Sequence, residues 1–199
     1  MDVIAAMETC SAARYLKPDP VPQELIERVI YAATRASSPG NSQHWDFIVV
    51  RNPEVKRKIR DLLVPRFKAM AVGLPTTGRA PSKMLAGAMN LAETMNEAPA
   101  IIFVCGPVAY PPNAPVEQFV WSALYPAAQN LIVAARSLGL GTTFTTFHMF
   151  MESELRELLG IPNEIKFGVM IPVGWPQNEF AKVRRKPIAS VIHWDKWSD

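Results

Sequence analysis

Residues 34–45, with the sequence TRASSPGNSQHW, gather hydroxyl and carboxamide side chains in one short stretch. Pro39 and Gly40 restrict and bend its backbone. Among its side chains, Ser37, Ser38, Asn41 and Gln43 can offer hydrogen-bond donors and acceptors to a ligand. Such a set suits a flat ligand with polar edges. Serine and asparagine also favour capped turns, so a turn that only ends a helix is an equal alternative.

The elements on either side place this segment at the edge of a core. Apolar residues recur at helical spacing before it, which predicts a helix from Pro22 to about Ala36. The run FIVV at 47–50 follows it and predicts a strand over residues 46–51. The polar segment therefore connects an amphipathic helix to a buried strand.

The rest of the chain alternates helical and strand patterns without a strict βαβ order. Residues 73–81 are rich in Gly, Pro and Thr and predict a mobile loop. Helices are expected over residues 2–12, 53–71 and 151–159, and two further helices are expected to end near residues 97 and 138. The expected strands lie at 100–105, after 141 and at 166–173. This order predicts an α+β fold of helices around a small sheet, with a doubly wound sheet as the second choice.

Length and composition favour one domain over residues 1–199, because a chain with 49% hydrophobic residues can bury one substantial core. The net charge of +3 is scattered, and the densest basic cluster, 182–186, lacks interleaved aromatic residues, which speaks against nucleic-acid binding. This cluster is either an anion clamp or a solvated tail. The long apolar stretch 119–135 contains polar residues and a proline, so we expect a buried helix and no membrane span.

Cys10 and Cys105 are the only cysteines, which is typical of a reduced compartment and predicts a cytoplasmic protein. The three histidines show neither HxxxH nor HExxH spacing, so no metal site is expected. No GxSxG elbow or P-loop occurs, and a possible dinucleotide fingerprint starting at Gly139 has Phe144 in place of its third glycine. A polar ligand loop without an evident acid, nucleophile or metal indicates that a cofactor carries the reaction.

Several motifs, in one order along the chain, resemble those of the FMN-dependent nitroreductase family. RYLKPDPVP at 14–22 contains the family's early arginine and linker, and ASSPGNSQHW at 36–45 resembles its A-P-S-x-x-N-x-Q-P-W motif. The later matches are YPAAQNL at 125–131, LGLGTTFTT at 138–146, LLGIP at 158–162, GWP at 174–176 and RKP at 185–187. The resemblance spans nearly the whole chain and implies a nitroreductase-like fold, with a central, mostly antiparallel sheet flanked by helices.

The resemblance implies FMN as the cofactor and a partner for each part of it. Arg14 and Arg185 match the two chain ends that relatives bring together around the phosphate, whose oxygens suit a guanidinium fork. The positions that match the lining of the ribityl chain and ring edge are Ser38, Pro39, Asn41 and Gln43, and those that match the stretch with backbone N–H groups near flavin N5 are Thr145 and Thr146. Surface charges at the arginines and ordinary strand residues at the threonines are the alternatives.

The chain departs from the family pattern near its start. Relatives often carry a second arginine three or four residues before the Arg14 position, with a serine between, whereas this chain reads CSAA at 10–13. One phosphate contact is therefore expected to be missing. The residues that could replace it are Thr9 and Ser11 through a hydroxyl, and Lys182 and Arg184 through a charge. His44 also stands where relatives have a proline.

The implied reaction is ping-pong: NADH or NADPH reduces FMN and leaves, and a nitroaromatic, quinone or similar electron-poor acceptor then takes the electrons. No catalytic protein residue is required. The same fold also serves flavin-consuming and dehalogenating enzymes, and the departure at 10–13 leaves a non-enzymatic flavin-binding protein as a further alternative. The sequence does not choose between NADH and NADPH and does not name the natural acceptor.

Relatives place the substrate slot at a homodimer interface, which implies the same assembly here. Phe119, Trp121, Tyr125 and the loop 73–81 are the expected wall of the slot. The segment IASVIHW at 188–194 resembles the family's terminal strand, which commonly crosses to the partner. An apolar tail of this kind predicts an obligate homodimer, since it would otherwise be hard to bury.

Overall fold

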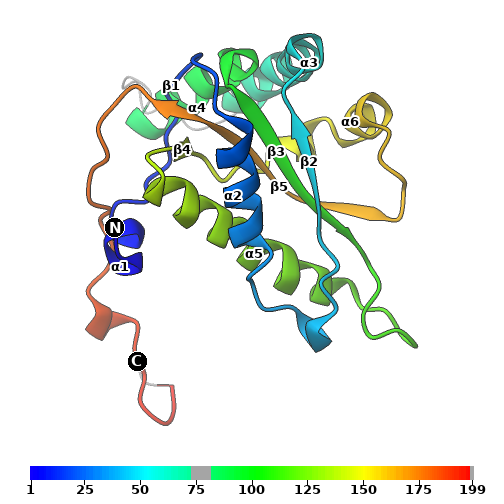
Figure 1. Ribbon diagram of the computed structural model, residues 1–199, viewed down its shortest axis with the longest axis vertical. Helices are drawn as coiled ribbons and strands as arrows, with labels where there is room; N and C mark the ends of the chain where they lie inside the picture. The colour runs from blue at the N-terminus through cyan, green and yellow to red at the C-terminus, as the bar shows by residue number, and fades with distance from the viewer. Residues whose placement is uncertain (73–81, 198–199) are drawn as a thin grey trace.

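The computed structural model describes residues 1–72 and 82–197, and they form a small sheet with helices on both faces (Figure 1). The strands run in the order β1-β5-β3-β2, β4 also pairs with β5, and every pairing is antiparallel. They are β1 (Leu16–Lys17), β2 (Asp46–Val50), β3 (Ala100–Pro107), β4 (Gly141–Thr142) and β5 (Ile165–Pro176). The predicted α+β fold is confirmed, and the antiparallel pairing excludes a doubly wound parallel sheet.

Six α-helices and four short 3₁₀ helices are present in the described part of the chain. The α-helices are α1 (Val3–Glu8), α2 (Gln23–Ala33), α3 (Pro53–Val72), α4 (Lys83–Glu93), α5 (Glu117–Ser137) and α6 (Glu152–Leu159). The 3₁₀ helices are η1 (Pro39–Asn41), η2 (Met95–Glu97), η3 (Phe147–Phe150) and η4 (Ile188–Ser190). The helix expected to end near residue 97 is therefore α4 followed by the separate turn η2. The expected mobile loop 73–81 lies outside the described residues.

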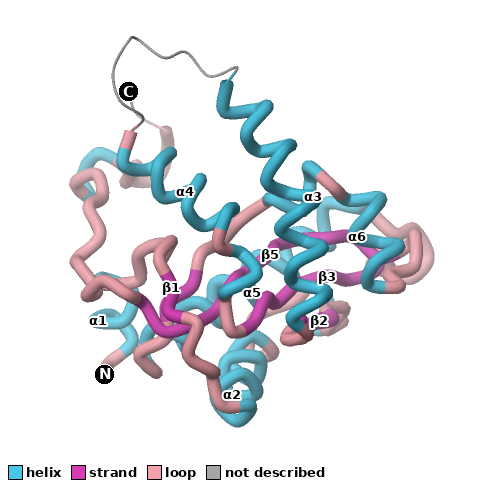
Figure 2. The backbone as a smooth tube through the Cα atoms, turned by 90° about the horizontal axis from the view of Figure 1, so that it is seen from above, coloured by secondary structure: helices cyan, strands magenta, loops and turns pink. Residues whose placement is uncertain are grey.

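The central strands β3 and β5 are buried on both faces, which explains why their sequences are almost continuously apolar. One face, with Ile102 and Val104 of β3, packs on α2 and α5. The other face, with Ile101 and Phe103, packs on α3, α4, η3 and α6. Figure 2 shows α3 and α4 on one side of the sheet and α2 on the other. The fold therefore has three layers, and β2 forms one edge of the middle layer.

The N-terminal helix is shorter than expected: it ends at Glu8 and not near residue 12. The Thr9 hydroxyl donates to the Ala5 carbonyl at 2.8 Å and closes the last turn. The chain then runs extended, and the Ala13 N–H donates to the Thr142 carbonyl at 2.9 Å. A long-range hydrogen bond to the sheet region thus replaces helix continuation, and it brings residues 11–15 next to the threonine-rich segment after α5.

The C-terminal segment 188–194 is not a strand within the single chain. It begins with the turn η4, and the tail extends away from the body beyond α1 (Figure 1). Ile188 and Trp194 are 74% and 82% exposed. An isolated segment has no neighbouring strand to supply ladder hydrogen bonds, so its β-forming residues alone do not make it a strand. None of the helices in residues 1–72 and 82–197 has the length and apolarity to cross a bilayer.

Candidate functional site

The loop between α2 and β2, residues 37–45, is ordered by its own polar groups; we refer to it as the Ser38 loop. The Ser38 hydroxyl accepts a hydrogen bond from the Gln43 backbone N–H at 3.0 Å, and the Ser38 carbonyl accepts one from the Asn41 N–H at 3.0 Å. Gly40, Asn41 and Gln43 all have positive φ, at 59°, 50° and 53°. Three left-handed residues in four positions turn the chain far more sharply than a helix end requires.

The side chains of this loop remain available to a ligand. Asn41 and Gln43 are exposed, and the Asn41 carboxamide has no hydrogen-bond partner in the part of the chain that the structure describes. Gly40 lies against Tyr110, because a Cβ added to Gly40 would lie only 2.4 Å from Tyr110 Cε2. The loop is therefore rigid and has exposed polar side chains, of which Gln43 also donates to the Asn41 carbonyl at 3.4 Å. This arrangement is compatible with both the ligand-loop and the capped-turn interpretations.

Arg14 lies in a separate recess of about 230 Å³ between the segment before β1, the start of α4 and the end of β5. We call this the Arg14 recess; its lining residues include Ser11, Arg14, Lys83, Gly87, Glu179 and Phe180. The Asn90 side chain donates to the Arg14 carbonyl at 2.9 Å, and the Arg14 side chain packs against Gly87. These contacts fix Arg14 against α4 and aim it at the recess.

Two cations in the Arg14 recess lack an anionic partner. Neither the Arg14 guanidinium nor the Lys83 ammonium makes an ion pair with any described residue, although Glu179 lines the same recess. Unpaired guanidinium and ammonium groups beside a serine hydroxyl form a fitting set of donors for a phosphate. Lys83 was missed by the sequence reasoning, because it stands on a different element from Arg14 and far from it along the chain.

The structure distinguishes among the residues that could replace the missing early arginine. Thr9 uses its hydroxyl at the end of α1, and Lys182 pairs with Glu8 at 3.4 Å. Ser11 lines the Arg14 recess. Arg184 is exposed and its carbonyl accepts from Arg185.

Arg185 is not brought into the Arg14 recess. Its guanidinium donates to the neighbouring Arg184 carbonyl at 2.9 Å, and its side chain is exposed. The lining of the recess extends along the chain after β5 only as far as Phe180. The expected meeting of the two arginines is therefore absent from the described single chain.

The two threonines of the expected N5 stretch are placed differently. Thr145 is buried, and both its N–H and its hydroxyl donate to the Met170 carbonyl, at 3.1 and 2.7 Å. Thr146 is exposed, and its N–H has no partner among the residues described. Thr146 thus has the free backbone donor of the pair, whereas Thr145 fixes the segment to β5.

The cysteine thiols and the possible metal ligands can also be compared with the geometry that nucleophilic or metal-dependent catalysis requires. Burial, together with the nearby Asp46 carboxylate, raises the pKa of the Cys105 thiol to about 12. Because only the thiolate is strongly nucleophilic, Cys105 is an inert core residue at neutral pH. Within the described ranges, no three His, Cys, Asp or Glu side chains gather in a way that could hold a metal ion.

The Ser38 loop and the Arg14 recess lie at opposite ends of β5. At one end Ile165 pairs with Pro107, close to the Tyr110 that contacts Gly40. At the other end Pro176 pairs with Leu16 and lines the Arg14 recess. The 12 residues of β5 span about 36–40 Å at the usual rise per strand residue. Figure 1 shows this separation, with the turn after α2 at the lower end and β1 and α4 at the upper end.

Comparison with known proteins connects both regions to one family. The model of the Nitroreductase family matches residues 9–175, a range that contains Arg14, the Ser38 loop and both threonines. This extended, ordered match covers most of the chain. The protein therefore belongs to the nitroreductase family.

Relatives with different names match this chain. A protein of Archaeoglobus fulgidus named as an NADH dehydrogenase/NAD(P)H nitroreductase is 30% identical over 182 residues, covering 89% of this chain and 88% of that protein. Iodotyrosine deiodinase 1 of Rattus norvegicus is also 30% identical, over 82% of this chain but only 58% of its own length. Among solved structures, an iodotyrosine deiodinase bound to FMN and 3-iodo-L-tyrosine has a TM-score of 0.82 at 20% identity, covering 98% of this chain and all of that one.

Proposed function

We propose that the protein is an FMN-dependent oxidoreductase that uses NADH or NADPH to reduce electron-poor aromatic acceptors such as nitroaromatics or quinones. The observation that carries this proposal is the Arg14 recess, where two unpaired cations meet a hydroxyl in a member of the nitroreductase family. In this proposal residues 1–199 act as one FMN-binding domain. The free thiols of Cys10 and Cys105 suit a cytoplasmic location.

The residues present fit FMN in three places. Arg14, with Lys83 and Ser11, would hold the phosphate end, where fixed positive charge offsets the phosphate dianion. Ser38, Pro39, Asn41 and Gln43 would present the donors and acceptors of the Ser38 loop to the ribityl chain and ring edge. Thr146 would offer its free N–H to the ring, while Thr145 holds that segment in place.

Bound FMN would supply the two-electron chemistry between the nicotinamide and the acceptor. The work of this chain would be binding and orientation: cations fix one end of the cofactor and the rigid Ser38 loop fixes the other. A backbone donor at Thr146 would favour negative charge that develops on the adjacent ring. No protein acid or base is assigned.

The separation of the two regions supports a homodimer. FMN is much shorter than β5, so one molecule cannot reach the Arg14 recess and the Ser38 loop of the same chain. Two copies arranged so that the loop of one faces the recess of the other would complete two equivalent sites, as a two-fold interface does. The exposed aromatic side chains Phe119, Tyr125 and Phe144 would then be covered by the partner.

The exposed tail and the sheet edge offer a matching pair of surfaces for such a dimer. Within the described sheet β2 pairs only with β3, so its other edge has free backbone groups. Beside it lies an apolar recess of about 610 Å³, whose lining includes Ile26, Ile30, Ile48, Val49, Leu158 and Leu159. Residues 188–194 of a second copy would add a strand to this edge and bury their apolar side chains in the recess.

A dehalogenase is the second candidate function. It is favoured by the 30% identity to rat iodotyrosine deiodinase 1 and by the high structural similarity to a deiodinase. Such an enzyme would use the same FMN site with a halogenated aromatic substrate. Turnover of 3-iodotyrosine under reducing conditions, against turnover of a nitroaromatic with NADH or NADPH, separates the two activities.

An absorption spectrum of the purified protein, before and after anaerobic NADH or NADPH, tests the proposal directly. We expect a visible flavin band that bleaches with the nicotinamide. A band that persists would indicate a flavin-binding protein, and absence of a band after FMN addition would contradict the proposal. Loss of the flavin spectrum during aerobic turnover would indicate a flavin-consuming enzyme.

The Arg14→Ala variant tests the phosphate assignment. Loss of hydrogen bonds to a charged group should weaken FMN binding by about 1.5–3 kcal/mol, or roughly 10- to 150-fold in Kd. Arg28→Ala is the matched control, because Arg28 is an exposed arginine on α2, outside the Arg14 recess. Equal FMN affinity of the two variants would remove Arg14 from the site.

A further inference from the structure

A second recess, of about 270 Å³, lies beside Thr146 between the N-terminal half of α5, η3 and the start of β5. We call it the His148 recess. Its lining includes Glu117, Trp121, Tyr125, Thr146, His148 and Lys166. It has both an aromatic wall and polar groups, the combination typical of a site for a small molecule. The family motifs do not include His148 or Lys166.

The aromatic wall is formed by one face of α5. Trp121 and Tyr125, one helical turn apart, stack with ring centroids 5.8 Å apart and planes 20° apart. The ring of Tyr125 also packs on that of Phe144, with the ring centroids 5.9 Å apart. Tyr125 and Phe144 are 41% and 43% exposed, so this cluster is only half covered by the described chain. Such a wall offers offset stacking to a planar ring.

His148 supplies the buried polar group. It is only 3% exposed, and its Nδ1 atom is fully buried and has no hydrogen-bond partner among the residues that the structure describes. Its ring stacks on Phe167 at 5.6 Å, which fixes its position against β5. Burial lowers the pKa of His148 to about 4, so the imidazole is neutral at neutral pH and has one donor and one acceptor nitrogen. A buried polar atom without a partner is costly unless a ligand or water satisfies it.

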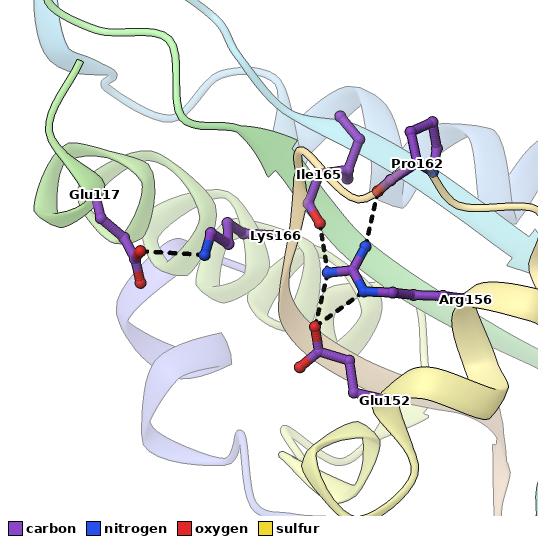
Figure 3. Close-up of polar contacts among 6 residues, drawn as sticks. All are labelled: Glu117, Glu152, Arg156, Pro162, Ile165 and Lys166. Carbon is purple, nitrogen blue, oxygen red and sulfur yellow. Dashed lines mark hydrogen bonds and ion pairs between the residues drawn. The ribbon is translucent and has the colours of Figure 1, made fainter. Parts of the chain in front are cut away.

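The charged groups around the recess are largely paired with one another. Lys166 Nζ lies 3.1 Å from a Glu117 carboxylate oxygen, and Glu152 accepts hydrogen bonds from Arg156 (Figure 3). Paired charges do not demand a charged ligand. Among the described residues, the buried side chain at this recess that has an unpartnered polar atom is the neutral His148 imidazole, so a neutral hydrogen-bonding ligand suits the recess best.

We propose that the His148 recess binds a small planar aromatic molecule that carries a hydroxyl group, with its ring on the Trp121–Tyr125 wall and its hydroxyl hydrogen-bonded to His148. Thr146 lines this recess and is also the residue assigned to the flavin ring. The ligand is therefore the acceptor class of the proposed function, namely hydroxylated electron-poor aromatics. The role of this ligand as electron acceptor rests on the proposed function, whereas its binding to the His148 recess can be measured without turnover.

The test uses FMN-loaded protein labelled with ¹⁵N-histidine, with 3-nitrophenol and 3-nitrotoluene as probes. These compounds have similar shape, but the second has a methyl group in place of the hydroxyl. The chain has three histidines, so His44 and His193 are internal controls. In a buffer well below the pKa of the phenol, we expect 3-nitrophenol to shift the His148 imidazole resonances and to leave the other two unchanged. 3-Nitrotoluene should shift them much less.

Variants then separate the hydrogen bond from the stacking contact. We expect unaltered protein to bind 3-nitrophenol about 2- to 10-fold more tightly than 3-nitrotoluene, as one net hydrogen bond allows. His148→Phe should abolish this preference, and His148→Gln should retain part of it. Trp121→Leu should weaken both compounds alike and leave the preference intact.

Two results would overturn the inference: an unmoved His148 resonance at saturating 3-nitrophenol, or equal shifts with both probes. The labelled-protein measurement does not depend on whether a His148 variant folds. It also needs no turnover, so a failure of the recess assignment can be distinguished from a failure of the proposed function. If His148 responds as expected but nicotinamide does not bleach the flavin, the recess assignment holds and the reductase proposal fails.

Discussion

His148 is expected to make stability depend on pH. In the unfolded chain its pKa returns to about 6.5, whereas burial lowers it to about 4 in the folded protein. Between these values the unfolded state binds more protons, so the free energy of unfolding decreases as pH falls through this window. The full contribution, on the order of 3 kcal/mol, is present above pH 6.5 and lost near pH 4. Glu152 opposes the shift, and Lys166 and Glu117 are the other charged groups at this recess.

Urea unfolding of unaltered protein and His148→Phe at several pH values between 4 and 7 measures this effect. The variant should lose stability less steeply on acidification, while slopes from carboxyl groups remain in both proteins. An NMR titration of the imidazole provides a second check. If His148 titrates near its ordinary pKa in the folded protein, the burial argument is wrong.

Individual residues show where the sequence was informative. The types and spacing of Ser38, Asn41 and Gln43 predicted either a ligand loop or a capped turn. Local hydrogen bonds do order that loop, and ligand binding there stays a prediction. The spacing could not reveal that the N–H and the hydroxyl of Thr145 both donate to the Met170 carbonyl, since this depends on the register of a strand 25 residues away. Lys83 and His148 were missed for a related reason: each gains its significance from a recess formed by distant segments.

Arg156 connects α6 to the start of β5 and illustrates stabilisation at the scale of an element. Its guanidinium donates to the Pro162 and Ile165 carbonyls at 2.7 and 2.8 Å and to Glu152 one turn earlier (Figure 3). The planar fork reaches the three acceptors from separate nitrogens, whereas a lysine ammonium has all of its N–H donors on one atom and fits this spread of acceptors poorly. Arg156→Lys should therefore lower the free energy of unfolding by about 1.5–3 kcal/mol.

Arg60→Lys is the control for this comparison, because Arg60 forms an exposed pair with its neighbour Asp61. A surface pair of this kind should change stability by less than about 0.5 kcal/mol. Both variants keep their charge, so denaturant midpoints compare geometry alone. Equal midpoints for the two variants would mean that the α6–β5 connection contributes little.

The long elements were predictable because hydrophobic periodicity determines them. The expected strands at 46–51, 100–105 and 166–173 correspond to β2, β3 and β5, and the structure extends the last two. The end of α1 and the conformation of residues 188–194 were not predictable in the same way. The first is set by the long-range hydrogen bond from Ala13 to Thr142, and the second lacks the neighbouring strand that a ladder requires.

At the scale of the whole molecule, β5 separates the Ser38 loop from the Arg14 recess by nearly the length of the sheet. The two halves of the proposed FMN site lie this far apart in one chain, which gives two copies a physical reason to associate in that proposal. The family model spans both regions, yet a linear match contains no information about which copy supplies each half of a site. Oligomeric state is therefore the property on which cofactor binding is expected to depend most strongly.

Removing residues 188–199 tests this dependence. The tail places Ile188, Val191, Ile192 and Trp194 in solvent, and the free edge of β2 lies beside an apolar recess that could receive them from a second copy. Without the tail, we expect light scattering after size-exclusion chromatography to give monomer or aggregate, and FMN binding to fall with dimer content. A shorter deletion, of residues 196–199, retains the segment 188–194 and should leave the dimer intact. A stable, FMN-loaded dimer from the longer deletion would exclude tail exchange, and the association would then have to rest on the exposed aromatic face of α5.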